Sequence, residues 1–412
     1  MSGIIEWMRE ADWLIRRRLV VYAAIFVAMY AIAAVVWLAI SSGGIDMNGK
    51  PIGSDFVNVW AAGSLALADQ PAGVYDYNIH HEAQKAAFGG EHVPYYGWHY
   101  PPMFLLAALP LALLPYLAAL GLWMVATLPL FLLAIYRILP RRETLLLALA
   151  FPGVFVNLGH GQNGFLTTAL LGGGLMLLER RPMLAGILFG LLTYKPQFGL
   201  LIPLVLLLGW RWDTIVVATA TATFVAMVSV LLFGPETWIA FIDSLALTRE
   251  AIVEQGVTGW HKIVSVFAAA RMSGANVAFA YLVQAAVGVC AAVTVLRLWT
   301  PAVPHGLKCA ALVTATPLLT PYLLDYDLVI LALPIAWLAA DGLKRGFLPW
   351  EKVTLAAIWL LPMLSRLIAM GVSVPLTPPL LMVLLFLIFR RARHPEFAGG
   401  PHTDVRPQAA HA

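Results

Sequence analysis

Charge is scarce in this chain. Asp, Glu, Lys and Arg make up only 12% of the 412 residues, about half of the roughly 25% found in soluble domains. Hydrophobic residues make up 61%, which excludes a soluble enzyme and a disordered chain. The apolar residues form continuous runs rather than alternating segments of about ten residues, so an outer-membrane barrel is disfavoured. We expect an all-α polytopic membrane protein, because helices satisfy their own backbone hydrogen bonds in lipid.

Cysteine is also scarce. Cys290 and Cys309 both lie in apolar segments and lack the spacing of a metal site, so we interpret them as small core residues. We expect no cofactor and no required metal. The formal net charge of +4 comes without a basic stripe carrying interleaved aromatic residues, and we therefore expect no nucleic-acid partner. Basic residues at cytoplasmic helix ends explain the net positive charge.

The N-terminal region predicts an uncleaved membrane anchor. Three arginines at 16–18 precede an apolar stretch at 19–40, which is too long for a signal peptide and long enough to span a bilayer. The distribution of Lys and Arg then predicts that both termini are cytoplasmic. Counting apolar runs predicts about twelve spans, although several runs are short for an independent span. Such short helices are tolerated where they are buried in protein or line a cavity.

This topology divides the chain into one integral-membrane domain, two large outer loops and a tail. The domain covers residues 1–390, with outer loops at 41–100 and 234–262. Residues 391–412 are polar and contain Gly and Pro, which predicts a disordered cytoplasmic tail.

The same topology places the unusual polar residues at the outer face. Ionisable groups at membrane depth are costly and usually face a cavity or an ion path. The residues gathered there are Asp55, Tyr95, Tyr96, His99, Tyr100, His160, Gln162, Asn163, Lys195, Gln197, His261, Lys262, Arg271, Asp325, Tyr326 and Asp327.

Each of these motifs also has a structural explanation. Asp55 fits a loop carboxylate or a helix cap, and Asp325 and Asp327 fit a cap on the helix that follows them. The glycines of the 159–164 turn fit a plain turn. Lys195 has apolar residues on both sides, so it either reaches the membrane interface or contacts an anion.

Together the polar residues indicate a substrate that is anionic in one part, apolar in another and rich in hydroxyls in a third. A lipid-phosphate-linked sugar has this chemistry. Lys195, His261, Lys262 or Arg271 would hold its phosphate, and aromatic rings would stack on the sugar. The alternatives are a secondary transporter or lipid flippase, which would carry charges near the midplane and often inverted repeats, and a polysaccharide ligase or polymerase.

Several motifs in order resemble glycosyltransferase family 87. They are GSDF at 53–56, VYD at 74–76, YPP at 100–102, GQN at 161–163 and KPQ at 195–197, and the resemblance is best over residues 50–200. It implies a GT-C fold and an inverting transfer of a hexose from a polyprenyl-phosphate sugar to a lipid or glycan acceptor. Mannose is the first candidate for this hexose. The resemblance also implies an inner-membrane enzyme with a periplasmic site, Asp55 as general base and no required metal.

One segment departs from the family pattern. Where the family often has Ser-Pro-x-Ser-Trp-x-His-His, this chain has TPYLLDYD at 320–327, with Tyr326 and Asp327 in place of the histidines. His99 or His261 would then supply the missing group, or the site handles another donor or acceptor. For the donor phosphate we favour Lys195, followed by His261, Lys262 and Arg271. The remaining outer-face residues, Tyr95, Tyr96, His99, Tyr100, His160, Gln162, Asn163, Gln197, Asp325, Tyr326 and Asp327, would form the sugar and acceptor site.

Overall fold

The fold is built from helices throughout the part of the chain that the computed structural model describes, residues 2–90 and 92–395. The first half contains α1 (Ser2–Glu10), α2 (Arg16–Ala39), α3 (Phe56–Leu67), α4 (Tyr77–Ala86), α5 (Leu105–Leu111), α6 (Tyr116–Ile138), α7 (Arg142–Leu149), α8 (Pro152–His160), α9 (Gly164–Leu177) and α10 (Pro182–Leu191). The second half contains α11 (Ile202–Leu208), α12 (Trp212–Phe233), α13 (Pro235–Thr248), α14 (Val266–Met272), α15 (Val277–Leu298), α16 (His305–Leu319), α17 (Ala332–Arg345), α18 (Glu351–Val372) and α19 (Thr377–Ala392).

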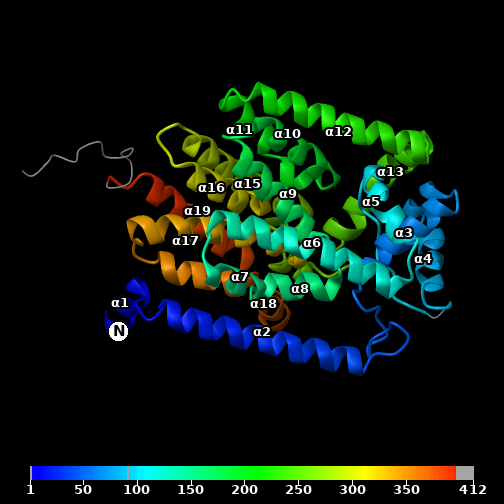
Figure 1. The fold of residues 1–412 in the computed structure, drawn as a ribbon, viewed down its shortest axis with the longest axis horizontal. Helices are drawn as coiled ribbons and strands as arrows, with labels where there is room; N and C mark the ends of the chain where they lie inside the picture. The colour runs from blue at the N-terminus through cyan, green and yellow to red at the C-terminus, as the bar shows by residue number, and fades with distance from the viewer. Residues whose placement is uncertain (1, 91, 396–412) are drawn as a thin grey trace, which may run out of the picture.

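Short 3-10 and π segments connect several of these helices. They are η1 (Pro71–Tyr75), η2 (Pro102–Phe104), η3 (Leu192–Tyr194), η4 (Pro196–Gly199), the π-helix η5 (Arg249–Glu254), η6 (Trp260–Lys262) and η7 (Asp325–Leu331). In Figure 1, α2 and α12 run along opposite edges of the molecule. The helices α3, α4 and α5 gather at one end, and the N-terminus lies at the other.

Six helices in the described residues are long and apolar enough to cross a membrane, and seven if the bent pair α7–α8 is one span. The two parts of that pair meet at 50°. Five further apolar helices, of 10–17 residues, are too short by this measure. The chain is therefore a multi-pass membrane protein, as its composition predicts, but the expected twelve spans are not confirmed. Several apolar runs counted as spans form helices of only 10–17 residues, a length that is tolerated where a helix is buried in protein or lines a cavity.

The two predicted outer loops are folded and pack together. The 41–100 loop contains α3, η1 and α4, and the 234–262 loop contains α13 and η5. Helix α13 contacts η1 of the first loop. Within the first loop, the buried His80 contacts the Asn58 carbonyl through its Nε2 at 3.1 Å, and Gln84 donates to the Tyr96 carbonyl at 2.7 Å. These bonds hold α4 on α3 and fix the 92–100 segment that precedes η2 and α5.

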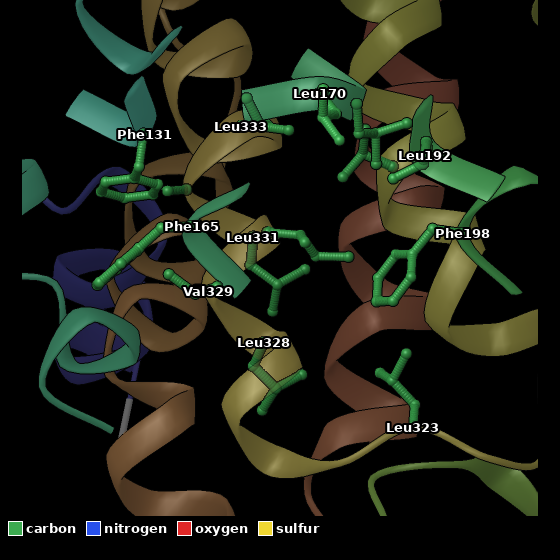
Figure 2. Close-up of a cluster of buried hydrophobic side chains, with 14 of the residues drawn as sticks. Phe131, Phe165, Leu170, Leu192, Phe198, Leu323, Leu328, Val329, Leu331 and Leu333 are labelled. Carbon is green, nitrogen blue, oxygen red and sulfur yellow. The ribbon is translucent and has the colours of Figure 1, made fainter. Parts of the chain in front are cut away.

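The segment 323–333 passes through the middle of the buried core (Figure 2). Leu328, Val329 and Leu331 are fully buried, and η7 packs on α8, α9 and α18. On one side, Phe131 of α6 meets Phe165 of α9 with ring centroids 5.4 Å apart. This packing fixes the start of η7, where the acidic residues 325 and 327 lie.

The last helix extends beyond the predicted boundary of the tail. Helix α19 continues to Ala392, and Arg391 is fully buried between Asp341 and Glu351. The tail prediction for 391–412 thus begins inside a packed helix, and its residues 396–412 lie outside the described part.

Candidate functional site

Asp55 lies at the start of α3 without capping it. It occupies the N-cap position, but its side chain makes no capping hydrogen bond. Its Oδ2 instead lies 3.4 Å from the Nδ1 of His160 and accepts a hydrogen bond at 3.4 Å from the Nε2 of Gln162. The Asp55 side chain is 17% exposed and that of His160 is 25% exposed. The carboxylate is therefore held from one side and open to a ligand from the other.

The turn after α8 holds these partners in place. Helix α8 ends at Gly161, whose φ of +63° is left-handed, a conformation that glycine adopts without strain. A Cβ at Gly161 would lie 2.7 Å from the Cβ of Phe56. The Asp55 amide donates to the His160 carbonyl at 3.0 Å, which ties this turn to the start of α3. The glycine is thus needed for the close approach that brings His160 to Asp55.

A chain of hydrogen bonds extends from Gln162 into the protein. Its Oε1 accepts from the Tyr100 hydroxyl at 3.1 Å and from the Asn163 amide at 3.1 Å. Asn157 donates to the Gln162 carbonyl at 3.0 Å. The side-chain amide of Asn163 is buried and has no hydrogen-bond partner in the described part of the chain. These contacts connect Tyr100, His160, Gln162 and Asn163 to Asp55.

Two cations accompany the carboxylates at this site. Residues 263 and 324 form an antiparallel bridge, which brings η6, and with it Lys262, to the start of η7. Arg366 of α18 lies there too, with its Nη1 3.4 Å from the Oδ2 of the buried Asp325. The side chain of Arg366 is 31% exposed, and Lys262 is half-buried. Both cations therefore have part of their surface free for an anion.

The electrostatics favour an ionised Asp55. Burial alone raises the pKa of Asp55, but the neighbouring His160, the Gln162 hydrogen bond and the charge of Lys262 lower it below its usual value. Burial and the nearby Arg366 lower the pKa of Lys262, and Asp55 counteracts them. Asp55 is thus available as a proton acceptor at neutral pH.

Lys195, predicted to bind the donor phosphate, forms a buried ion pair inside the protein. It is buried between η3 and η4, and its Nζ lies 2.6 Å from the Oδ1 of Asp327. It also lies over the rings of Tyr100, Phe198 and Tyr326, with Nζ 5.3–6.0 Å from their centroids. Its charge is therefore already balanced inside the protein, and a phosphate would have to compete with Asp327. Its role in donor binding stays a prediction that this ion pair does not favour.

The predicted late residues 325–327 lie close to the Asp55 cluster. The ring of Tyr326 lies 5.8 Å from that of His160. Asp325 accepts from the Tyr326 amide at 2.9 Å in addition to its contact with Arg366. Asp325 and Tyr326 thus border the cluster, whereas Asp327 lies behind them with Lys195.

The aromatic residues of the first loop are only partly at the site. Burial lowers the pKa of His99 to about 4, while Asp55 acts in the opposite direction, so His99 is neutral at pH 7. Its Nδ1 lies 3.2 Å from the Thr248 hydroxyl. Tyr96 lies near enough to Asp55 for that charge to raise its pKa in addition to burial. Tyr95 packs against Tyr77 of α4 with ring centroids 4.5 Å apart.

Three further residues predicted for the site, Arg271, His261 and Gln197, lie in different surroundings. Arg271 stacks on Trp260 at 4.6 Å and donates to the Ala275 carbonyl at 2.7 Å, so its guanidinium is engaged in holding its own loop. His261 is half-buried, and burial together with Arg366 and Lys262 lowers its pKa, which places it beside the two cations. Gln197 is half-buried in η4. None of these placements tests a binding role.

Sequence reasoning missed Arg366. Its signal was a single arginine in the apolar run LPMLSRLIAM, and an ionisable residue inside a membrane helix is by default a functional candidate. In the described residues, no three His, Cys, Asp or Glu side chains are placed to hold a metal ion.

These features define a multi-pass membrane protein with a carboxylate, a histidine and cations gathered in one cluster. The family model "Glycosyltransferase family 87" matches residues 98–321, more than half of the chain. The protein therefore belongs to glycosyltransferase family 87 and is a membrane glycosyltransferase. The match contains the 157–164 turn, Lys195 and Lys262, whereas Asp55 and Arg366 lie outside it. No curated protein and no solved structure matches the chain.

Proposed function

We propose that this glycosyltransferase transfers a hexose, with mannose the first candidate, from a polyprenyl-phosphate sugar to a lipid or glycan acceptor. We place the reaction at the outer face of the inner membrane, on a GT-C fold with both termini cytoplasmic. Family membership favours this enzyme over the transporter and flippase alternatives. The observation that carries the proposal is the partly exposed Asp55 carboxylate, oriented by Gln162 and His160 and flanked by Lys262 and Arg366.

In this proposal Asp55 is the general base. The acceptor hydroxyl oxygen attacks the anomeric carbon while its proton passes to the Asp55 carboxylate. The bond between the anomeric carbon and the phosphate oxygen breaks, and polyprenyl phosphate leaves. A single displacement of this kind inverts the anomeric configuration. Gln162 and His160 orient the carboxylate, so that it is already positioned to accept the proton of the hydroxyl.

The leaving phosphate gains negative charge as the bond breaks, and fixed cations stabilise such charge. We assign this role to Lys262 and Arg366, with His261 beside them, in preference to the Lys195 that the sequence favours. Lys195 is neutralised by Asp327 at 2.6 Å, whereas the Arg366–Asp325 distance is 3.4 Å and the arginine is 31% exposed. Neither metal nor cofactor has a part in this mechanism.

The donor class can be tested with membranes that contain the full-length protein. They are incubated separately with radiolabelled polyprenyl-phosphate mannose, polyprenyl-phosphate glucose and a nucleotide-linked mannose. We expect label from one lipid-linked donor to appear in a new lipid or glycan, and membranes without the protein to give none. Transfer directly from the nucleotide sugar, or from no donor, would contradict the proposal.

A further inference from the structure

A cavity of about 490 Å³ lies between α2 and the rest of the protein. Apolar side chains make up most of its wall. They include Leu19, Ala23 and Phe26 of α2, Leu147 of α7, Ala336 of α17 and Leu355 of α18. A cavity this large falls in the usual size range of ligand sites.

Helix α2 is attached to the protein at a few points that frame this cavity. Arg16 forms an ion pair with Glu143 at one end. Phe26 meets Trp359 edge-on at 5.1 Å, and Tyr30 stacks on Phe155 at 4.5 Å farther along. The helix buries little of its surface and runs along the edge of the fold (Figure 1). The space between these attachment points is therefore bordered by membrane lipid.

The cavity has the depth of one leaflet. Its α2 wall extends from Arg16 to Phe26, which is about 15 Å at a rise of 1.5 Å per residue. The hydrocarbon core of a bilayer is about 30 Å thick. An occupant anchored at the Arg16 end therefore reaches about the middle of the membrane, as the acyl chains of a phospholipid do.

The mouth of the cavity is positively charged. Arg16, Arg141 and Lys352 line it, with Glu143 as the acidic residue among them. Asp12 pairs with Lys352 at 2.7 Å from a largely exposed position. The lining itself thus has more positive than negative charge, and Arg141 is exposed.

Trp13 adds an unused hydrogen-bond donor to the same mouth. It lines the cavity, and its buried Nε1 has no hydrogen-bond partner among the residues that the structure describes. Its ring stacks on Trp7 at 5.1 Å, and tryptophans are enriched at membrane–water interfaces. A buried N–H without a partner is costly, and a phosphate or ester oxygen would satisfy it.

We propose that this cavity binds an anionic phospholipid, with its acyl chains against α2 and its phosphate among Arg16, Arg141, Lys352 and the Trp13 indole. Basic pockets between membrane helices bind anionic head groups in this way. Trp13 and Arg16 follow α1 near the N-terminus, whereas α3, which Asp55 precedes, lies at the opposite end of the molecule (Figure 1). We therefore distinguish this lipid from the sugar donor and acceptor. It fills the cavity that α2 lines together with α7, α17 and α18.

The apolar part is tested by two neighbouring alanines of α2. Ala23 lines the cavity and is 1% exposed, whereas Ala24 is exposed and does not line it. Full-length Ala23→Phe and Ala24→Phe variants in detergent are titrated with dioleoyl phosphatidylglycerol and with dioleoyl phosphatidylcholine. Bound lipid is counted by native mass spectrometry. We expect the wild type and Ala24→Phe to retain the anionic lipid and Ala23→Phe to lose it. Equal retention by both variants would overturn the proposal.

The headgroup part is tested by two exposed arginines at the same end, which also keeps the test valid if Ala23→Phe misfolds. Arg141 lines the cavity and Arg137 does not. We expect Arg141→Gln to reduce the preference for phosphatidylglycerol over phosphatidylcholine about fivefold, and Arg137→Gln to leave it unchanged. No preference in the wild type would refute the site. The same reduction in both variants would show only diffuse attraction and would refute it as well.

Discussion

The buried pair of Lys195 and Asp327 allows a sharp test of which residues hold the structure and which bind the donor. The side chains of both residues are 4% exposed, and their charged atoms are 2.6 Å apart. The pair joins the η3–η4 break to the start of η7, two segments that are 132 residues apart in the chain. We therefore expect Lys195→Met to act mainly on stability.

The expected magnitude follows from the charge that is left behind. Removal of one partner from a buried ion pair costs about 3–5 kcal/mol, because the other charge stays buried without compensation. At roughly 2 °C per kcal/mol for a large domain, Lys195→Met lowers Tm by about 6–10 °C. The double variant Lys195→Met/Asp327→Leu removes both charges and should recover most of this loss, since an apolar pair can replace a buried ion pair at little cost.

The assay is thermal unfolding of the purified protein in detergent, followed by tryptophan fluorescence, together with the KM for the lipid donor. A low Tm for the single variant and a recovered Tm for the double variant support the structural role. An unchanged Tm with a KM raised more than tenfold in both variants would refute it and return Lys195 to the donor phosphate.

Three further predictions concern the cluster around Asp55. Gly161→Ala should lower the free energy of unfolding by about 1–2 kcal/mol from its left-handed backbone alone, and it should also lower turnover. Gly159→Ala is the control, because a Cβ at Gly159 would have open space around it. It should behave as wild type in the same thermal and transfer assays. Gln162→Met removes a hydrogen bond that lowers the pKa of Asp55, so the acid limb of the pH–rate profile, where the base becomes protonated, should move to higher pH; an unmoved limb would exclude Asp55 as its source. Arg366→Gln should lower kcat/KM for the donor about 10–100-fold through loss of a charged contact, and Arg366→Lys should restore part of it, whereas equal losses in both would point to folding instead.

Much of the site could be predicted from local sequence. The apolar runs identify a membrane protein because lipid imposes that composition. The order of Asp55, the Tyr100 segment and the Gly161–Asn163 turn reflects one arrangement, in which the turn after α8 supports the start of α3. Gly161 is the clearest example, since its backbone conformation and its contact with Phe56 both require the absence of a side chain.

The rest depends on contacts between distant segments. The partner of Lys195 lies 132 residues away, so no local pattern reveals that its charge is balanced. Arg366 reaches the site because α18 packs against η7, which an apolar run with one arginine does not disclose. The count of about twelve spans stays unconfirmed for a similar reason, because whether a short apolar helix crosses the membrane or packs inside the protein depends on its neighbours.

The most direct test of the central claim is sugar transfer by the purified Asp55→Asn variant, compared with Asp69→Asn. Asp69 is an exposed loop carboxylate with φ +58°, a conformation that asparagine also adopts. With a labelled polyprenyl-phosphate sugar and acceptor, we predict wild-type transfer by Asp69→Asn and a loss of at least about 100-fold in kcat for Asp55→Asn, with unchanged donor binding. Transfer at the wild-type rate by Asp55→Asn would contradict the account.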